Sequence, residues 1–126
     1  MRIERRDGRP LVIGHRGAAA VAPENTLASL EAAVAAGVDL VEFDISPGLM
    51  LAHSESEVAD DSLSLDDALE FLRGHDVGAH LDVKSVGFEE DVVDAVRRHD
   101  FSGRAIVSTA YAQTLRRVAA LAPDLP

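Results

Sequence analysis

The chain has 126 residues, 47% of them hydrophobic, which is enough for one hydrophobic core but short for two. We therefore expect a single domain over residues 1–126. Twelve basic against 22 acidic residues give a net charge of −10, which disfavours nonspecific binding to nucleic acid or to an anionic membrane surface. The sequence contains no cysteine, which excludes disulfides and thiolate zinc sites.

The sequence offers no membrane segment. Residues 1–7 lack the apolar core of a signal peptide, and no stretch is long and apolar enough to span a bilayer. We therefore expect a cytoplasmic protein with no integral membrane segment.

The first elements predicted along the chain are two strands separated by a helix. The apolar run 11–13 is typical of a buried strand, and 39–45 predicts the second strand. Asn25 or Thr26 can cap the intervening helix, and Gly37 can end it. The apolar positions of this helix, at helical spacing, are Leu27, Leu30 and Val34.

The next elements continue the alternation. Residues 49–52 form a short apolar run that predicts a hairpin extension or a strand, and the acidic, serine-rich segment 54–62 predicts a loop. A helix is expected to begin at Ser64 and to end at Gly74, followed by a strand over 78–85. The last elements are a helix over 89–99, a strand over 105–108, and a helix with Leu115, Val118 and Leu121 before Pro123. Such alternation predicts an α/β fold with a parallel sheet covered by helices.

Carboxylates and basic side chains gather at the ends of two predicted strands. Glu42 and Asp44 lie two residues apart and so share one face of a strand, while Asp82 and Lys84 repeat this arrangement on another strand. Three carboxylates suit Mg²⁺ or Ca²⁺ better than zinc. The alternative interpretation is that these are strand-end charges balanced by basic residues such as Arg16.

The motifs of the chain also carry a family resemblance, through their order. They are His15-Arg16-Gly17, Pro-Glu-Asn-Thr at 23–26, Val-Glu-Phe-Asp at 41–44, His53, and Asp-Val-Lys at 82–84. This set resembles the glycerophosphodiester phosphodiesterase family. The resemblance implies a TIM-barrel hydrolase that releases glycerol 3-phosphate and an alcohol from a small glycerophosphodiester, with one divalent cation, Mg²⁺ or Ca²⁺.

The resemblance assigns roles to seven side chains. They are His15 and His53 as catalytic acid and base, Arg16 and Lys84 as phosphate ligands, and Glu42, Asp44 and Asp82 as metal ligands. Two positions depart from the family pattern. Asp82 stands where the family has glutamate, and the connection before His53 is short, with Ser54 following in place of aspartate.

The number of predicted strands is too small for a closed barrel. A closed barrel takes about 250 residues and eight strands, whereas this chain offers four or five. We expect TIM-barrel-like units forming about the N-terminal half of a barrel domain, truncated at the C-terminus. An incomplete polypeptide, a homo-oligomer completing the barrel and an open sheet with a protected edge all remain open.

Two alternative functions also remain. One is a noncatalytic half-barrel that binds phosphate or metal. The other is a related phospholipase-type phosphodiesterase or lyase, which the acidic balance and the aromatic content of 4% disfavour.

Several other polar residues are not expected to take part in catalysis. His75 and His99 lie at predicted helix ends, and His80 is predicted to be a packed core histidine. Ser108 ends a strand without a nucleophile elbow or a readable base, which disfavours serine catalysis. Glu24 and Asn25 suit a helix start, and the resemblance implies that they also order the site.

Overall fold

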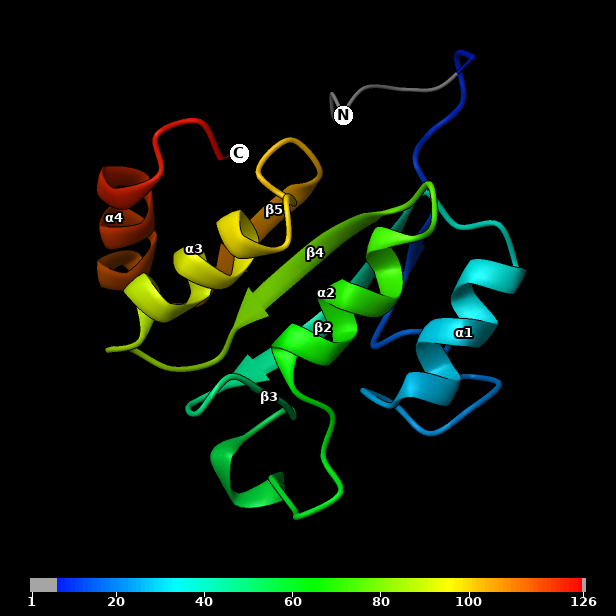
Figure 1. The fold of residues 1–126 in the computed structure, drawn as a ribbon, viewed down its shortest axis with the longest axis horizontal. Helices are drawn as coiled ribbons and strands as arrows, with labels where there is room; N and C mark the ends of the chain where they lie inside the picture. Colours follow the sequence, from blue (N-terminus) through cyan, green and yellow to red (C-terminus); the bar gives the residue numbers. More distant parts are fainter. Residues whose placement is uncertain (1–6, 126) are drawn as a thin grey trace.

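A five-stranded sheet organises the computed structural model, which describes residues 7–125 (Figure 1). Four strands run parallel in the order β1-β2-β4-β5, and β3 pairs antiparallel with the end of β2. The strands are β1 (Ile13–Gly14), β2 (Leu40–Ser46), β3 (Met50–Leu51), β4 (Gly78–Val83) and β5 (Ala105–Thr109). This arrangement confirms the predicted α/β class and the hairpin extension after the second strand.

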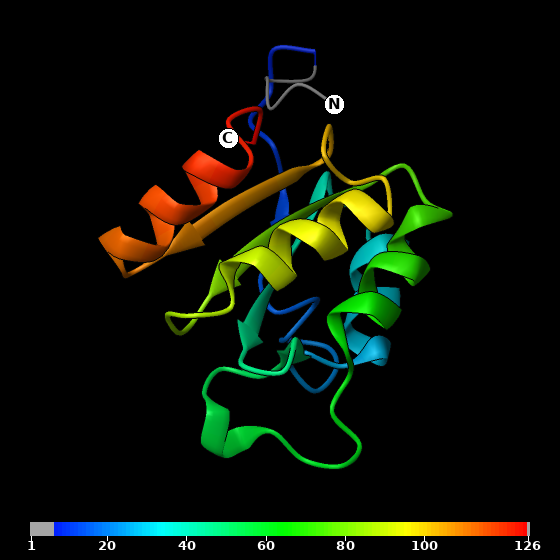
Figure 2. The same cartoon turned by 60° about the vertical axis from the view of Figure 1, so that its left-hand side comes forward.

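Among residues 7–125, three helices connect the parallel strands, and a fourth follows the last strand. They are α1 (Leu27–Ala35), α2 (Leu65–Arg73), α3 (Glu89–Arg98) and α4 (Ala112–Leu121), with a short 3₁₀ helix at Glu55–Glu57 in the segment expected to be a loop. Each parallel strand lies beside the preceding one, so right-handed crossovers place the connecting helices on the same side of the sheet. Figure 1 shows α2 in front of β2 and α3 in front of β5, and Figure 2 shows the same layers turned by 60°.

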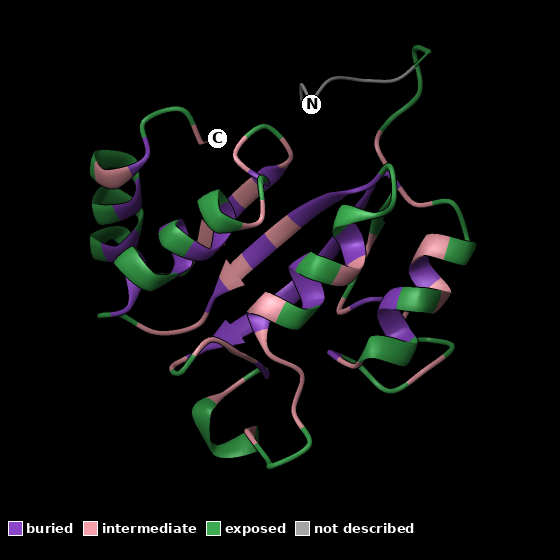
Figure 3. Cartoon of the chain, in the orientation of Figure 1, coloured by how far each residue is buried: buried purple, intermediate pink, exposed green. Residues whose placement is uncertain are grey.

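The strand register separates a core face from a polar face. Phe43 lies opposite Leu81, and both side chains are fully buried in the core under the helices. Because successive side chains alternate, the residues between them point to the other face. There, Asp44 lies opposite Asp82, which in turn lies opposite Ser108. Figure 3 shows the buried strands behind helices whose outer sides are exposed.

The helix starts follow the capping predictions. Thr26 caps α1 in a capping box with Ser29, and Ser64 caps α2 by accepting a hydrogen bond from the backbone N–H of Asp67. Asn25 is therefore not the cap of α1, and its side chain is free for the contact described below.

The structure corrects the predicted first strand. The extended part is Ile13–Gly14 rather than 11–13, and it is not buried, because Val12 is 51% and Ile13 is 44% exposed. The reason is topological: β1 is an outer strand of the sheet among the described residues, so only β2 covers it on one side.

Two further apolar positions and one histidine also differ from expectation. Leu27 and Leu115 are exposed, whereas Thr114 is buried in α4. Leu27 begins its helix, and Leu115 lies on the outer side of α4. His80 is half-buried on the polar face of the sheet rather than packed in the core.

The sheet does not close into a barrel in residues 7–125, since β1 and β5 are its two outer strands. No helix in this part of the chain is long and apolar enough to cross a membrane.

Candidate active site

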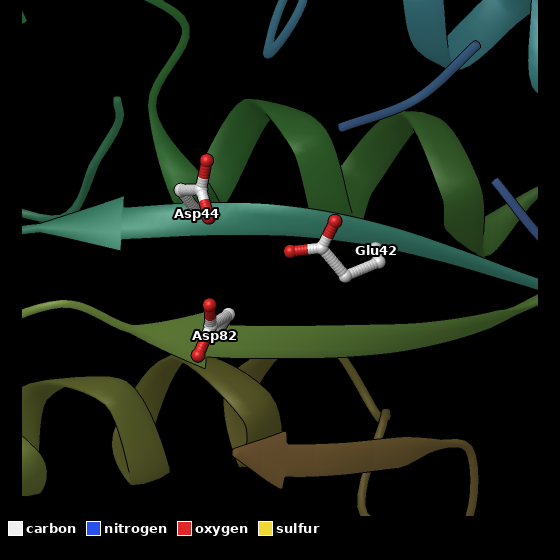
Figure 4. Close-up of side chains that lie close together, drawn as sticks. All are labelled: Glu42, Asp44 and Asp82. Carbon is white, nitrogen blue, oxygen red and sulfur yellow. The ribbon is translucent and has the colours of Figure 1, made fainter. Parts of the chain in front are cut away.

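Three carboxylates converge on the polar face of the sheet. Glu42 and Asp44 come from β2 and Asp82 from β4, and Figure 4 shows them gathered across the two strands. One oxygen of each lies within 4.8 Å of the others, and Glu42 and Asp44 are only 6% and 1% exposed. A group of hard oxygen donors that is largely withdrawn from water fits a Mg²⁺ or Ca²⁺ ion, so the residues present suit the cation that the sequence implies.

Arg16 lies at the centre of the site. Its backbone N–H donates to Glu42 Oε2 at 2.9 Å, and its Nη1 donates to Glu24 Oε2 at 2.7 Å. Its Nε lies 2.9 Å from Asp44 Oδ2, an ion-pair contact without hydrogen-bond geometry, and its Nη2 donates to His53 Nδ1 at 2.8 Å. The hydrogen bond to Glu24 leads the contacts that raise the pKa of Arg16, against the opposing effect of burial. Arg16 therefore stays charged and links three elements.

The backbone turn at Arg16 and Gly17 makes this arrangement possible. Both residues have positive φ, 51° and 83°, a conformation that glycine adopts freely and arginine does not. Gly17 donates from its N–H to the Glu42 carbonyl at 3.0 Å, and a Cβ at this position would lie 2.6 Å from the Ser29 backbone. The turn is thus packed directly between β2 and α1, which fixes where Arg16 points.

Asn25 holds Asp44 from the other side. Its Nδ2 donates to Asp44 Oδ2 and its Oδ1 accepts from the Asp44 backbone N–H, both at 3.1 Å. Burial alone would raise the pKa of Asp44, but the Asn25 hydrogen bond and the charges of Lys84 and Arg16 outweigh it and lower the pKa. Asp44 is therefore ionised at neutral pH.

Lys84 bridges two of the carboxylates. Its Nζ lies 3.3 Å from Asp44 Oδ1 and 2.6 Å from Asp82 Oδ2. Burial lowers the pKa of Lys84, but its contacts with Asp82 and Asp44 prevail and raise it. The alternative interpretation of Lys84 and Arg16 as partners of the carboxylates therefore describes real contacts, and these contacts are compatible with binding an anion as well.

The pKa of Glu42 is raised, whereas that of Asp44 is lowered. Burial is the main cause that raises the pKa of Glu42, with a smaller contribution from the Asp44 charge, and the Arg16 backbone N–H opposes this shift. The nearest histidine nitrogen, His15 Nε2, is 3.8 Å from Glu42 Oε2, and the His15 side chain is 72% exposed. His15 therefore lies beside the carboxylate cluster with most of its side chain in solvent.

His53 follows β3 and faces Arg16. The Nδ1 atom of His53 accepts a hydrogen bond from Arg16, because a guanidinium can only donate. Its 3.6 Å approach to Asp44 Oδ2 is consequently not an ion pair in this arrangement. In the neutral ring the proton must lie on Nε2, so the side chain, which is 47% exposed, can offer that proton. The short antiparallel β3 strand thus delivers His53 to the site despite the short connection.

Two polar residues beside the carboxylates were not predicted from the sequence to belong to the site. His80 and Ser108 lie on the face that carries Asp82, joined to each other by a hydrogen bond of 2.8 Å. The sequence shows that His80 lies two residues before Asp82 and so on the same face of β4. The pairing of Asp82 with Ser108, in contrast, depends on the register of β4 and β5. His75 and His99 lie at helix ends, as expected, and His99 contacts Asp66 of α2.

Comparisons with known proteins find similarity to one family of enzymes. The sequence profile of the "Glycerophosphoryl diester phosphodiesterase family" matches residues 15–46. The chain is 26% identical, over 155 aligned residues, to a protein of Caldanaerobacter subterraneus subsp. tengcongensis named "Glycerophosphodiester phosphodiesterase", covering 91% of this chain and 64% of that protein. The aligned span exceeds the 126 residues of this chain, so the relative has additional residues within it.

Solved structures show the same fold. A glycerophosphodiester phosphodiesterase from Agrobacterium tumefaciens superposes with a TM-score of 0.77 at 22% identity, covering 91% of this chain and 64% of that one. A putative glycerophosphoryl diester phosphodiesterase from Silicibacter pomeroyi also gives 0.77, at 21% identity, covering 94% of this chain and 64% of that one.

The chain therefore spans slightly less than two thirds of the length of these relatives. Within that span, its fold is the TIM-barrel-like fold that the motifs predicted, with the sheet left open. Sequence profile, relative and solved structures together confirm the predicted resemblance of this chain to the glycerophosphodiester phosphodiesterase family.

Proposed function

We propose that the chain carries out metal-dependent hydrolysis of glycerophosphodiesters to glycerol 3-phosphate and an alcohol. The observation that supports this most strongly is the convergence of three carboxylates, Arg16, Lys84 and two histidines on one face of the sheet. This set offers ligands for a cation, positive groups for a phosphate and titratable groups for proton transfer at a single place.

A divalent cation, Mg²⁺ or Ca²⁺, held by Glu42, Asp44 and Asp82 would polarise a phosphoryl oxygen of the substrate. Arg16 and Lys84 are charged and already lie over the carboxylates, so they can turn to an incoming phosphodiester without a change of protonation. There they would bind the phosphate oxygens and stabilise the negative charge that grows during cleavage.

The two histidines divide the proton transfers. His53 has its proton on Nε2, because Arg16 donates to Nδ1, and can therefore protonate the departing alcohol as general acid. His15 is exposed beside the carboxylate cluster and can, as general base, accept the proton of the water or substrate hydroxyl that attacks phosphorus while the bond to the alcohol breaks. A cavity of about 350 Å³ beside His53, lined in part by Glu24 and Leu63, can take the alcohol portion.

The experiment is a rate measurement with glycerophosphocholine as substrate. The unaltered chain is expected to release glycerol 3-phosphate in the presence of Mg²⁺ or Ca²⁺ and to stop when EDTA is added. His15→Ala and His53→Ala should each lower the rate by a factor of about 10²–10⁴. The matched control is His75→Ala, since His75 packs against Phe71 of α2, 5.0 Å between ring centroids, away from the site.

The same assay distinguishes an enzyme from the alternative of a noncatalytic binding module. Equal rates for the unaltered chain and the two site variants would contradict the assigned roles of the histidines. Phosphate or metal binding by a folded chain without any turnover would favour the binding module.

Three further expectations stay predictions. They are that residues 1–126 form a single domain, that the protein acts in the cytoplasm, and that a homo-oligomer is one way of completing the barrel, beside a longer polypeptide and an open sheet with a protected edge. The outer strands β1 and β5 among the described residues leave these three possibilities open. The mass of the particle that the chain forms in solution tests for the homo-oligomer directly.

A further inference from the structure

Three polar side chains are joined by hydrogen bonds across β4 and β5: His80 and Asp82 of β4, with Ser108 of β5 between them. His80 Nε2 lies 2.8 Å from Ser108 Oγ, and Ser108 Oγ lies 3.1 Å from Asp82 Oδ1. Ser108 is directly opposite Asp82 in the strand register, and His80 precedes Asp82 by two residues on the same face. The three side chains are therefore direct and diagonal neighbours on one surface of the sheet.

The direction of these hydrogen bonds follows from the protons available. An ionised carboxylate can only accept, so the single hydroxyl proton of Ser108 is donated to Asp82. The hydroxyl oxygen must then accept from His80, which places the proton of the neutral ring on Nε2. His80 Nδ1, buried and without a hydrogen-bond partner among the described residues, is consistent with a ring whose orientation is set by Ser108.

The two oxygens of Asp82 consequently have different partners. Oδ1 accepts from Ser108, whereas Oδ2 contacts Lys84 Nζ at 2.6 Å. Lys84 is a flexible side chain that also contacts Asp44, but Ser108 is a short side chain fixed on a strand. The Ser108 contact is therefore the one that persists if Lys84 moves to another anion.

We propose that Ser108, held by His80, is a positioning residue that fixes Oδ1 of Asp82 and leaves Oδ2 facing the other two carboxylates to receive a divalent cation. This inference rests on the proposed function, because it assumes that the cluster binds a cation. It adds a residue of β5 to a site whose carboxylates come from β2 and β4. Without the Ser108 hydroxyl, the Asp82 carboxylate is free to rotate and to pair fully with Lys84.

The test is calorimetric titration of the whole chain with Mg²⁺, Ca²⁺ or Mn²⁺ alone, in the absence of substrate. Ser108→Ala is expected to weaken binding by a factor of about 10–100, the usual effect of losing a hydrogen bond to a ligating carboxylate. Ser108→Thr keeps the hydroxyl and should retain affinity close to that of the unaltered chain. His80→Leu removes the donor to Ser108 and should weaken binding in the same direction as Ser108→Ala.

The matched control is Thr109→Val, the next residue on β5. Thr109 Oγ1 donates to the Val83 carbonyl at 2.9 Å, and its side chain lies on the opposite face from Asp82. This variant loses a hydroxyl and a hydrogen bond of the same strand, so it should lower the melting temperature without changing cation affinity. A melting curve of every variant separates weaker binding from unfolding.

The outcomes distinguish this inference from the proposed function. Unchanged cation affinity in a folded Ser108→Ala chain overturns the role of Ser108, while the proposed function stands if the unaltered chain binds and turns over substrate. Equal weakening by Thr109→Val and Ser108→Ala overturns the specific contact with Asp82. No cation binding by the unaltered chain overturns both this inference and the metal site of the proposed function.

Discussion

Replacing Asn25 with alanine is expected to unfold the chain more easily, because this side chain makes two hydrogen bonds inside the site. It pairs with the backbone N–H and the carboxylate of Asp44, a residue only 1% exposed. Leaving that buried N–H without a partner costs about 1–3 kcal/mol. Asn25 also has a φ of 56°, where alanine is less favourable than asparagine by about 1 kcal/mol. Together, Asn25→Ala should reduce the free energy of unfolding by about 2–4 kcal/mol.

The assay is urea denaturation at pH 7, followed by circular dichroism, with the slope of the transition compared between variants. Asn25→Gly is the matched control, because it loses the same hydrogen bonds but tolerates positive φ. It should be more stable than Asn25→Ala by about 1 kcal/mol. A loss below about 0.5 kcal/mol for Asn25→Ala would refute the reasoning, since it would mean that the buried Asp44 N–H costs nothing when unpaired.

Two other substitutions test the site without substrate. Burial raises the pKa of Glu42 above its ordinary value of 4.5, so its ionisation destabilises the fold as pH rises from 4.5 through the raised pKa. Glu42→Gln should therefore melt at a higher temperature than the unaltered chain at pH 7 without divalent ions, and the gap should vanish at pH 4; a lower melting temperature at pH 7 would contradict this. Gly17→Ala should lower the free energy of unfolding by about 2–4 kcal/mol, because of backbone strain and the clash with Ser29. Gly37 also has a positive φ but has open space around it, so Gly37→Ala should lower the free energy of unfolding by only about 1 kcal/mol.

Local patterns predicted the elements and much of the candidate site. Ser64 was predicted as a helix cap and the first cap was narrowed to Asn25 or Thr26, because capping depends on residues close in sequence. Glu42 and Asp44 were placed on one face by the period of a strand. Their meeting with Asp82 depends in addition on the register of β2 and β4.

Contacts between elements distant in sequence could not be predicted in the same way. The Asn25 hydrogen bonds to Asp44 span 19 residues, and the Ser108 hydrogen bond to Asp82 spans 26. These pairings depend on how α1, β2, β4 and β5 dock against one another, which no local spacing encodes. The exposure of Val12 and Ile13 was missed for the same reason, because an apolar run does not reveal that its strand lies at the edge of a sheet.

The most direct measurement is ³¹P NMR of glycerophosphocholine mixed with the purified 126-residue chain, with Mg²⁺ or Ca²⁺ and then with EDTA. The proposed function predicts that the diester resonance is converted to that of glycerol 3-phosphate only while the divalent ion is free to bind. An unchanged diester spectrum from a folded chain in the presence of Mg²⁺ and of Ca²⁺ would contradict it.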